Sequence, residues 1–192
     1  MLPHMRSVRV FLSPLVALLA SACVRSGGES GVPAGEKTSM TIQVTSTVFE
    51  AGQAIPARHT CSGDDVSPPL TWSGVPSQAK SLALVCDDPD APAGTWVHWV
   101  VYGIPPSATA FPEGVAKRDT LADGTLQGTN DFRRIGYGGP CPPLGKPHRY
   151  FFKLYALDMA PALAPGATKR DLMSVIEGHI LAQGELMGTF KR

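Results

Sequence analysis

Two histidines, an aspartate and a tyrosine are the residues of this sequence whose types and spacing could do chemistry. Asp88 follows one apolar run, and His98 lies ten residues later inside a second apolar run. His148 and Tyr150 come directly after a Gly- and Pro-rich loop at 137–147. A carboxylate beside an imidazole can set its tautomer or keep it charged. Such a group could therefore transfer protons or bind an anion.

The loops beside these residues favour anion binding, provided that they meet at one end of a sheet. Gly139 and its neighbours would offer backbone N–H groups, which together with imidazolium suit a compact anion such as phosphate. Pro142 would fix the wall of the pocket without competing for protons. The predicted pocket thus combines the carboxylate of Asp88 with two imidazoles, a phenol and several N–H groups.

Each of these residues also has a purely structural interpretation. A single histidine on an apolar strand, such as His98, is more often a hydrogen-bonded core residue than a ligand. The segment Asp-Pro-Asp-Ala-Pro at 88–92 is by itself typical of a turn. Tyr150, which precedes two phenylalanines, is typical of a core. Spacing along the chain leaves both interpretations open, because it does not show whether the two loops meet.

The run at 95–102 is predicted to be a strand covered on both faces. It is rich in Val, Trp and Tyr, which strands prefer, and both of its alternating sets are largely apolar. Because side chains alternate along a strand, one face is predicted to carry Trp96, His98, Val100 and Tyr102. The opposite face is predicted to carry Val97, Trp99 and Val101.

Short strands separated by turns account for most of the remaining chain. Alternating β-branched and aromatic residues predict further strands at 40–49, 55–61, 81–86, 148–157 and 185–190. Helical spacing predicts one helix, from Lys169 to about Ile180, with Thr168 and Asp171 as its capping pair. Gly184 is predicted to end this region before the last strand. Many short strands with one late helix indicate a mostly antiparallel β domain.

The length, composition and charge of the chain limit which classes of protein it can belong to. The chain has 192 residues, enough for one domain with appendages, and 43% of them are hydrophobic while 17% are charged. Its 20 glycines and 18 prolines follow no period and favour turns between short strands. The formal net charge is +1 and the sequence contains no basic run, so no nucleic-acid partner is predicted.

The N-terminus predicts export. Two arginines, an apolar run and a group of small residues at 1–22 follow the order of a secretory signal peptide. Cys23, directly after it, resembles the acylated cysteine of a bacterial lipobox, with alanine rather than leucine three residues earlier. Residues 23–39 are predicted to be a lipidated cysteine and flexible tether, and 40–192 the folded domain. We expect a lipoprotein of the cell envelope; the alternative is a soluble secreted or periplasmic protein.

Five segments form a distinctive series of motifs: SPPLTW (67–72), DDPDAP (87–92), WVHWVVYGIP (96–105), GTNDF (128–132) and YGGPCPPLGKPHRYFFKLYALD (137–158). In this order they resemble the phosphatidylethanolamine-binding protein family, in its bacterial branch described as Raf-kinase-inhibitor-like. The similarity extends from about Met40 to the C-terminus. It implies a mostly β fold in which a central antiparallel sheet packs against a smaller sheet, with one or two short helices.

The resemblance also implies a ligand site. The family's anion pocket corresponds here to Asp88, Asp90, His98, His148 and Tyr150, with Trp96 and Pro142 on its wall. Members of the family bind phosphorylated head groups or small anions, and some inhibit serine proteases or regulate kinases. The resemblance implies no cofactor.

Three cysteines follow Cys23. Cys86, in a predicted buried strand, is expected to be a free thiol. Cys61 and Cys141 lie in loops near the predicted pocket, and an exported protein can join them by a disulfide, although no spacing rule requires it. Two cysteines and two histidines can also bind zinc, but the sequence has no closely spaced ligand pair, so no metal site is predicted.

Three functions are compatible with these residues. We expect a non-enzymatic, lipid-anchored binding protein whose pocket holds a small anion or a phosphate-bearing head group. One alternative is a serine protease inhibitor or signalling regulator that acts through surface loops, for which the long irregular segment 105–136 is the candidate. The other is an acid–base hydrolase that uses a histidine with Asp88. The sequence has no Gly-x-Ser-x-Gly elbow, His-Glu-x-x-His pair or P-loop, which favours binding over catalysis.

Overall fold

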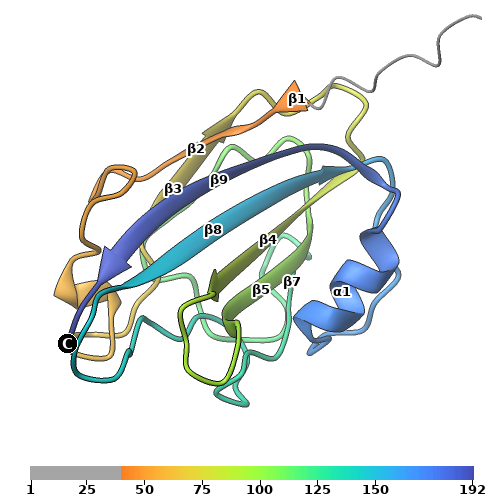
Figure 1. The fold of residues 1–192 in the computed structure, drawn as a ribbon. Helices are drawn as coiled ribbons and strands as arrows, with labels where there is room; N and C mark the ends of the chain where they lie inside the picture. The colour runs from red at the N-terminus through yellow and green to blue at the C-terminus, as the bar shows by residue number, and fades with distance from the viewer. Residues whose placement is uncertain (1–39) are drawn as a thin grey trace, which may run out of the picture. The chain divides into compact units, whose positions relative to one another are not determined.

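A six-stranded sheet forms the centre of the fold in the computed structural model, which describes residues 40–192 (Figure 1). Across the sheet the strands are β1 (Met40–Thr41), β9 (Ile180–Phe190), β8 (His148–Leu157), β4 (Ser81–Asp88), β5 (Trp96–Ile104) and β7 (Leu126–Gln127). Only β1 pairs in parallel; the other pairings within this sheet are antiparallel. The predicted signal peptide, lipidated Cys23 and tether lie outside the described residues.

A smaller antiparallel sheet packs against one face of the central sheet. It consists of β2 (Gln43–Thr45), β3 (Leu70–Ser73) and β6 (Ala110–Phe111). The apolar side chains buried between the sheets include Val44, Leu70, Trp72, Leu84, Trp99, Val101, Phe152 and Leu154. The mostly β fold with a central and a smaller sheet, expected from the sequence, is therefore confirmed.

The helix α1 (Lys169–Ile176) packs on part of the other face of the central sheet (Figure 1). Thr168 caps its N-terminus and forms a reciprocal capping box with Asp171, as predicted. Leu172 and Ile176 are buried against apolar side chains of the sheet. No helix of the described residues is both long and apolar enough to cross a membrane.

Two segments differ from the sequence prediction. The helix ends at Ile176 rather than near Ile180, because Gly178 adopts a left-handed conformation (φ 80°) that terminates it. β9 consequently begins at Ile180 and contains Gly184 inside the strand rather than before it. The segment predicted as a strand at 55–61 instead forms the 3-10 helix η1 (Ala57–His59).

Gly184 lies where another part of the chain crosses β9. A Cβ atom at this position would collide with the backbone carbonyl of Ile42, which lies in the short link between β1 and β2. Ile42 is buried, and its N–H donates a hydrogen bond to the carbonyl oxygen of Gln183 (2.9 Å). Glycine here thus allows the link between the two sheets to pack directly on the central sheet.

Gly184→Ala is expected to lower the free energy of unfolding by about 1–3 kcal/mol, because the added methyl group overpacks this crossing. Urea denaturation followed by circular dichroism measures the change. Gln183→Ala, at the exposed neighbouring position, is the control and should change stability by less than about 0.5 kcal/mol. Equal stability of the two variants would contradict the close backbone contact.

Candidate functional site

A β-bulge in β5 turns His98 toward the candidate site. In the pairing of β4 with β5, Cys86 faces Trp99 but Asp87 faces Val97, so His98 is an extra residue in its strand. The bulge reverses the alternation of side chains at this point. Val97 consequently packs with Val100 and Tyr102 beneath α1, whereas Trp99 packs between the two sheets.

The predicted faces of this strand are therefore wrong for Val97 and His98, on the N-terminal side of Trp99. Strict alternation placed His98 with Val100 and Tyr102, on the side that α1 covers. In the structure the ring of His98 instead lies 5.2 Å from that of Tyr150, whose side chain belongs to the core between the sheets. The bulge allows β5 to stay buried on both faces and still direct an imidazole into the site.

Three strand ends bring the other predicted residues together. β4 ends at Asp88, and the antiparallel strands β5 and β8 on either side of it begin at Trp96 and His148. The Nδ1–H of His148 donates a hydrogen bond to Oδ2 of Asp88 at 2.8 Å. The other carboxylate oxygen of Asp88 accepts the backbone N–H of Asp90, also at 2.8 Å. Asp88 is buried and thus orients the imidazole of His148 rigidly.

His98 is held by the opposite wall of the site. Its Nδ1–H donates to the carbonyl oxygen of Gly138 at 2.7 Å, and the N–H of Gly138 donates to the carbonyl oxygen of His98 at 2.9 Å. Burial lowers the pKa of His98 below its usual value, so the imidazole is neutral near pH 7. Because Nδ1 carries the proton, Nε2 has a free lone pair and can accept a hydrogen bond.

The segment that follows β7 supplies an aromatic wall that the sequence analysis did not include among the site residues. The backbone N–H of Val97 donates to Oδ2 of Asp131 (2.7 Å), and the N–H of Asp131 donates to the carbonyl oxygen of Val97 (3.0 Å). This double contact places Phe132 beside Trp96 and His98, with ring centroids 5.4 and 5.3 Å apart. The GTNDF motif was the sequence signal for it.

These elements enclose a cavity of about 200 Å³. It is lined by Asp88, Ala91, Pro92, Trp96, His98, Phe132, Cys141, Pro142, Pro143 and His148. A larger hollow of about 760 Å³ lies along β1, β8 and β9 and includes none of the predicted site residues. We regard the smaller cavity as the site, because His98, His148 and Asp88 converge there.

Two buried hydrogen-bond donors of the described residues lack a partner: one belongs to Trp96, which lines the cavity, and the other to Tyr150, whose ring contacts the lining residue His98. The indole N–H of Trp96 and the hydroxyl of Tyr150 form no hydrogen bond within residues 40–192. Burial, together with the nearby carboxylate of Asp88, raises the pKa of Tyr150 well above its usual range, so its hydroxyl keeps the proton. Buried donors are almost always paired in proteins. An acceptor atom bound in the cavity could satisfy both.

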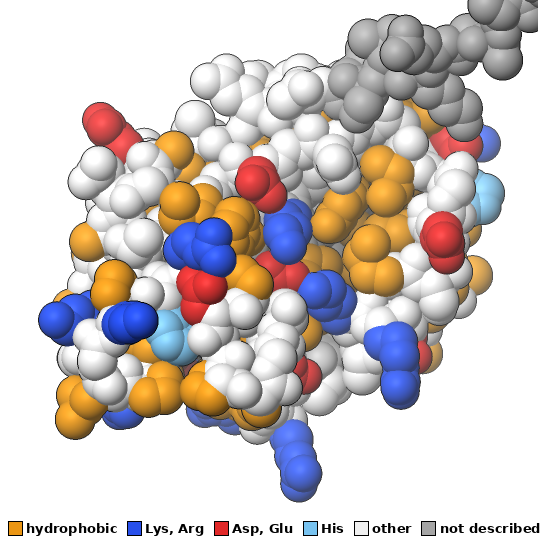
Figure 2. Space-filling view, in the orientation of Figure 1, with side chains coloured by type: hydrophobic (Ala, Val, Ile, Leu, Met, Phe, Trp, Pro, Cys, Tyr) orange, Lys and Arg blue, Asp and Glu red, His pale blue; other side chains and the backbone are white. Residues whose placement is uncertain are grey.

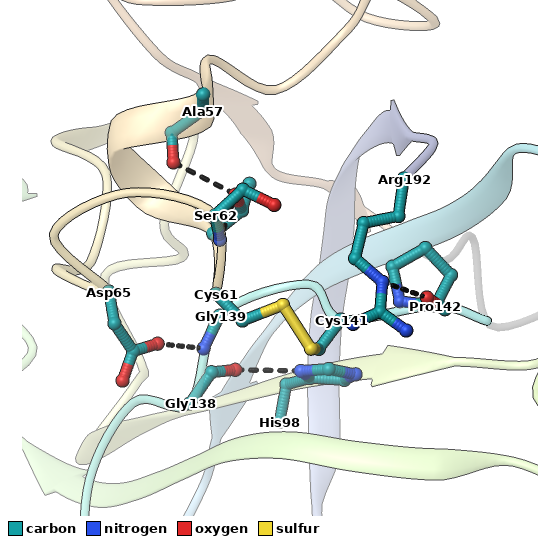
Figure 3. Close-up of a disulfide and its surroundings, with 11 residues drawn as sticks. Ala57, Cys61, Ser62, Asp65, His98, Gly138, Gly139, Cys141, Pro142 and Arg192 are labelled. Carbon is teal, nitrogen blue, oxygen red and sulfur yellow. Dashed lines mark hydrogen bonds between the residues drawn. A yellow bond between two sulfur atoms is a disulfide. The ribbon is translucent and has the colours of Figure 1, made fainter. Parts of the chain in front are cut away.

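The loop at 137–147 forms one wall and is braced from behind (Figure 3). A disulfide joins Cys61 to Cys141, with their Cα atoms 5.3 Å apart. The N–H of Gly139 donates to Oδ1 of Asp65 at 2.6 Å, and a Cβ at Gly139 would collide with the carbonyl oxygen of His59. The N–H of Gly139 is therefore already bonded and does not face a ligand, in contrast to the prediction.

Asp90 lies at the rim rather than in the cavity. Its carboxylate accepts two hydrogen bonds from the guanidinium of Arg149, at 2.7 and 2.9 Å. This contact lowers the pKa of Asp90 to about 2. Asp90 thus keeps Arg149 beside His148 and offers no free charge to a ligand, unlike the role that the resemblance implied.

Most of the predicted residues meet at this one place. Asp88, Trp96, His98, Pro142 and His148 line the cavity, the ring of Tyr150 packs against that of His98, Asp90 lies on the rim, and Gly139 supports the wall. Arg192 is an addition: its Nε–H donates to the carbonyl oxygen of Pro142 at 2.9 Å (Figure 3). Within residues 40–192 no group of three His, Cys, Asp or Glu side chains could hold a metal ion.

Comparisons with known proteins place the chain in a family. The family described as phosphatidylethanolamine-binding protein matches residues 45–191. A UPF0098 protein of Methanothermobacter thermautotrophicus is 54% identical over 138 residues, which are 72% of this chain and 91% of the relative. Another, of Pyrococcus horikoshii, is 42% identical over 193 residues, or 99% of this chain and 92% of the relative.

Two crystal structures have the same fold. One is a putative phosphatidylethanolamine-binding protein homolog of Chlamydia trachomatis, with a TM-score of 0.73 and 42% identity over 80% of this chain and 99% of the other. The second is the E. coli protein YbcL, described as a new member of the mammalian family, with a TM-score of 0.74 and 37% identity over 79% and 98%. At these identities the similarity extends beyond the fold to the sequence itself.

Replacing both disulfide cysteines, in Cys61→Ser/Cys141→Ser, is expected to lower the free energy of unfolding by about 4 kcal/mol. The bond closes a loop with a sequence separation of 80, and its loss restores the conformational entropy of the unfolded chain. Chemical denaturation measures the effect. Adding a reductant to the wild type should reproduce it, and the same reductant should leave the double variant unchanged. A reductant-sensitive double variant would contradict this assignment.

Proposed function

Because this chain belongs to the phosphatidylethanolamine-binding protein family, we propose that it is a non-enzymatic binding protein whose cavity holds a small anion or a phosphate-bearing head group. The proposal is supported above all by the two buried donors that lack a partner, Trp96 Nε1–H and Tyr150 O–H. Phosphate oxygens are strong acceptors, and charge-assisted hydrogen bonds to them are among the strongest in proteins.

The size of the cavity supports a compact ligand. Its volume of about 200 Å³ lies below the roughly 300–1,000 Å³ that is usual for drug-sized molecules. Trp96, Phe132 and two prolines form apolar walls, while the histidines and Asp88 supply the polar groups. A phosphate group with a short polar substituent fits this combination better than a bulky or entirely apolar ligand.

The charges in the cavity require that anion binding be coupled to protonation. Asp88 contributes a buried negative charge, which disfavours a second negative charge nearby. Its hydrogen bond with His148 holds that imidazole beside the carboxylate at the wall of the cavity. His98 is neutral in the absence of a ligand and becomes a donor at Nε2 only when it takes up a proton.

An exported location belongs to the same proposal. The Cys61–Cys141 disulfide supports it, since disulfides form and persist in oxidising compartments. The signal-like segment 1–22 and Cys23 support attachment to a membrane of the cell envelope through acyl chains. Transfer of radiolabelled palmitate to the wild type but not to Cys23→Ser would test the anchor directly.

The hydrogen-bonded pair of Asp88 and His148 favours one second candidate, an acid–base hydrolase. A carboxylate that orients an imidazole at 2.8 Å is the arrangement of a general base. Turnover of phosphoesters and carboxyl esters, lost in His148→Gln, would support this candidate. Binding without turnover in the same assays would support the binding protein.

Trp96→Phe and Tyr150→Phe are each expected to weaken the binding of phosphoethanolamine roughly 10- to 100-fold, because each removes one hydrogen bond to a charged group and retains an aromatic side chain. Isothermal titration calorimetry measures the affinity. Tyr155→Phe, which removes a tyrosine hydroxyl outside the cavity, is the control and should bind like the wild type.

Stability separates this effect from misfolding. Because the hydroxyl of Tyr150 has no partner in the ligand-free protein, Tyr150→Phe should leave the free energy of unfolding unchanged or raise it. Affinity and stability should therefore change in opposite directions. Unchanged affinity in both Trp96→Phe and Tyr150→Phe would overturn the proposal.

The affinity for sulfate is expected to rise as the pH falls from about 7.5 to about 5.5. Burial lowers the pKa of His98, and a bound anion raises it again by favouring the imidazolium, so binding takes up a proton. The gain can reach about tenfold per pH unit for each proton taken up. Sulfate is the probe because it does not titrate in this range. His98→Gln should reduce the slope; an affinity independent of pH in the wild type would contradict the coupling.

A further inference from the structure

The loop between two cavity-lining residues carries the most exposed large hydrophobic side chain of the described residues. Pro143 and His148 line the cavity, and the residues between them form neither helix nor strand. Leu144, in this loop, is 81% exposed, against 36% for the next most exposed, Val48 and Ile180. A single exposed leucine is unremarkable by itself; its position at the mouth of a ligand cavity gives it significance.

Apolar residues also lie on the opposite side of the mouth. Ala91 and Pro92 line the cavity from the loop after β4, and Pro92 and Ala93 are exposed. Figure 2 shows hydrophobic side chains interspersed with lysine and arginine at the end of the sheet where β8 begins in Figure 1. The rim around the cavity is therefore apolar on both sides.

Cations without an acidic partner surround this rim. Among the described residues, Lys146, Arg134 and Arg192 take part in no salt bridge. Lys146 follows Leu144 in the loop, Arg134 lies 5.4 Å from the ring of the cavity residue Phe132, and Arg192 bonds to Pro142. Asp90, an acid on the rim, is paired with Arg149. Asp131, next to Phe132, bonds to the N–H of Val97, and the three cations without an acidic partner outnumber it near the rim.

The cavity holds only part of a phospholipid. At about 200 Å³ it accommodates a head group but no pair of acyl chains. If the ligand is the head group of a lipid, its chains must leave through the mouth, past the loop that carries Leu144. The rim must then face the interior of a bilayer.

We propose that the rim of the cavity docks on membranes that contain anionic lipids, with Leu144 inserted among the acyl chains and Lys146, Arg134 and Arg192 at the level of the head groups. This inference rests on the proposed function, because it specifies a lipid still in its membrane as the source of the head group. Burial of an apolar tip and attraction of cations to anionic lipids are the two contributions that hold peripheral proteins at a membrane surface.

A membrane fits this rim better than an acidic protein segment. An extended peptide partner gains affinity by pairing with a strand edge, and the loop around Leu144 has no strand. The side chain of Leu144 is exposed to solvent, and it can enter a fluid hydrocarbon layer without a complementary pocket on a partner. Arginine and lysine side chains can then extend to the phosphates while their stems remain near the apolar layer.

The test uses an environment-sensitive fluorophore attached to Leu144→Cys in the full chain. Cys23→Ser is added so that acylation cannot occur; Cys61 and Cys141 are bonded to each other and Cys86 is buried, so the new thiol is the accessible one in the described domain. Vesicles of phosphatidylethanolamine with phosphatidylglycerol should shift the emission to shorter wavelength and increase its intensity. The matched control, Ile180→Cys, lies at the other end of β9, roughly 30 Å away, and should show no shift.

Affinity for the vesicles provides a second readout. Leu144→Ser should weaken vesicle partitioning roughly tenfold, since it removes the inserted apolar side chain. Lys146→Gln should weaken it about fivefold on anionic vesicles, and Lys80→Gln, an exposed lysine away from the cavity, should have no effect. Both Leu144→Ser and Lys146→Gln should retain the wild-type affinity for soluble phosphoethanolamine.

The outcomes distinguish the docking surface from the pocket. The docking proposal is overturned if vesicles do not change the emission of the fluorophore at residue 144, or if they shift the emission equally at residues 144 and 180. This holds even when the protein binds phosphoethanolamine. A shift produced by polyglutamate but not by vesicles overturns it in favour of an acidic protein partner. If the wild-type protein does not bind phosphoethanolamine, the proposed function is contradicted instead. A vesicle-induced emission shift confined to residue 144 would in that case still support the docking surface.

Discussion

The extra residue in β5 is the constraint on which the site depends. A strand that is buried on both faces has no free direction for a functional side chain, because every position belongs to one core or the other. By inserting His98 opposite the Cys86–Asp87 step, the bulge keeps Val97 beneath α1 and Trp99 between the sheets, and still turns one imidazole toward the cavity. The hydrogen bond from His98 to Gly138 then fixes the ring and its tautomer. Fold and site are thus built from the same strand.

Three closely spaced carboxylates at the end of β4 have different roles. Asp87 is fully buried on the helix side, where it pairs with Lys153 and Lys169 and ties the start of α1 to the sheet. Asp88, on the opposite face, orients His148, and Asp90 holds Arg149 on the rim. Each buried or half-buried charge has a specific partner, as the cost of burying an unpaired charge requires. Only the Asp88–His148 pair is left in contact with the cavity.

The cavity combines a rigid wall with groups that have no partner in the protein. The disulfide, the bond from Gly139 to Asp65 and the reciprocal bonds between His98 and Gly138 hold the wall at 137–147 in place (Figure 3). The donors of Trp96 and Tyr150 reduce the stability of the folded state as long as they lack an acceptor. Such an arrangement is typical of a site in which stability has been exchanged for affinity, because a preorganised wall reduces the entropy lost on binding.

The sequence by itself determined the class of fold, the capping of α1 by Thr168 and the position of β8, since these follow from local alternation and short-range hydrogen bonds. Through their motifs it also brought together Asp88, Trp96, His98 and His148, which line one cavity in the structure. Tertiary structure alone decided that His98 leaves the face that alternation predicts, that Gly139 faces Asp65 rather than a ligand, and that Phe132 and Arg192 reach the cavity and its rim. Each of these depends on contacts between segments far apart in the chain, and the bulge changes the faces of Val97 and His98 without leaving a pattern in the local sequence.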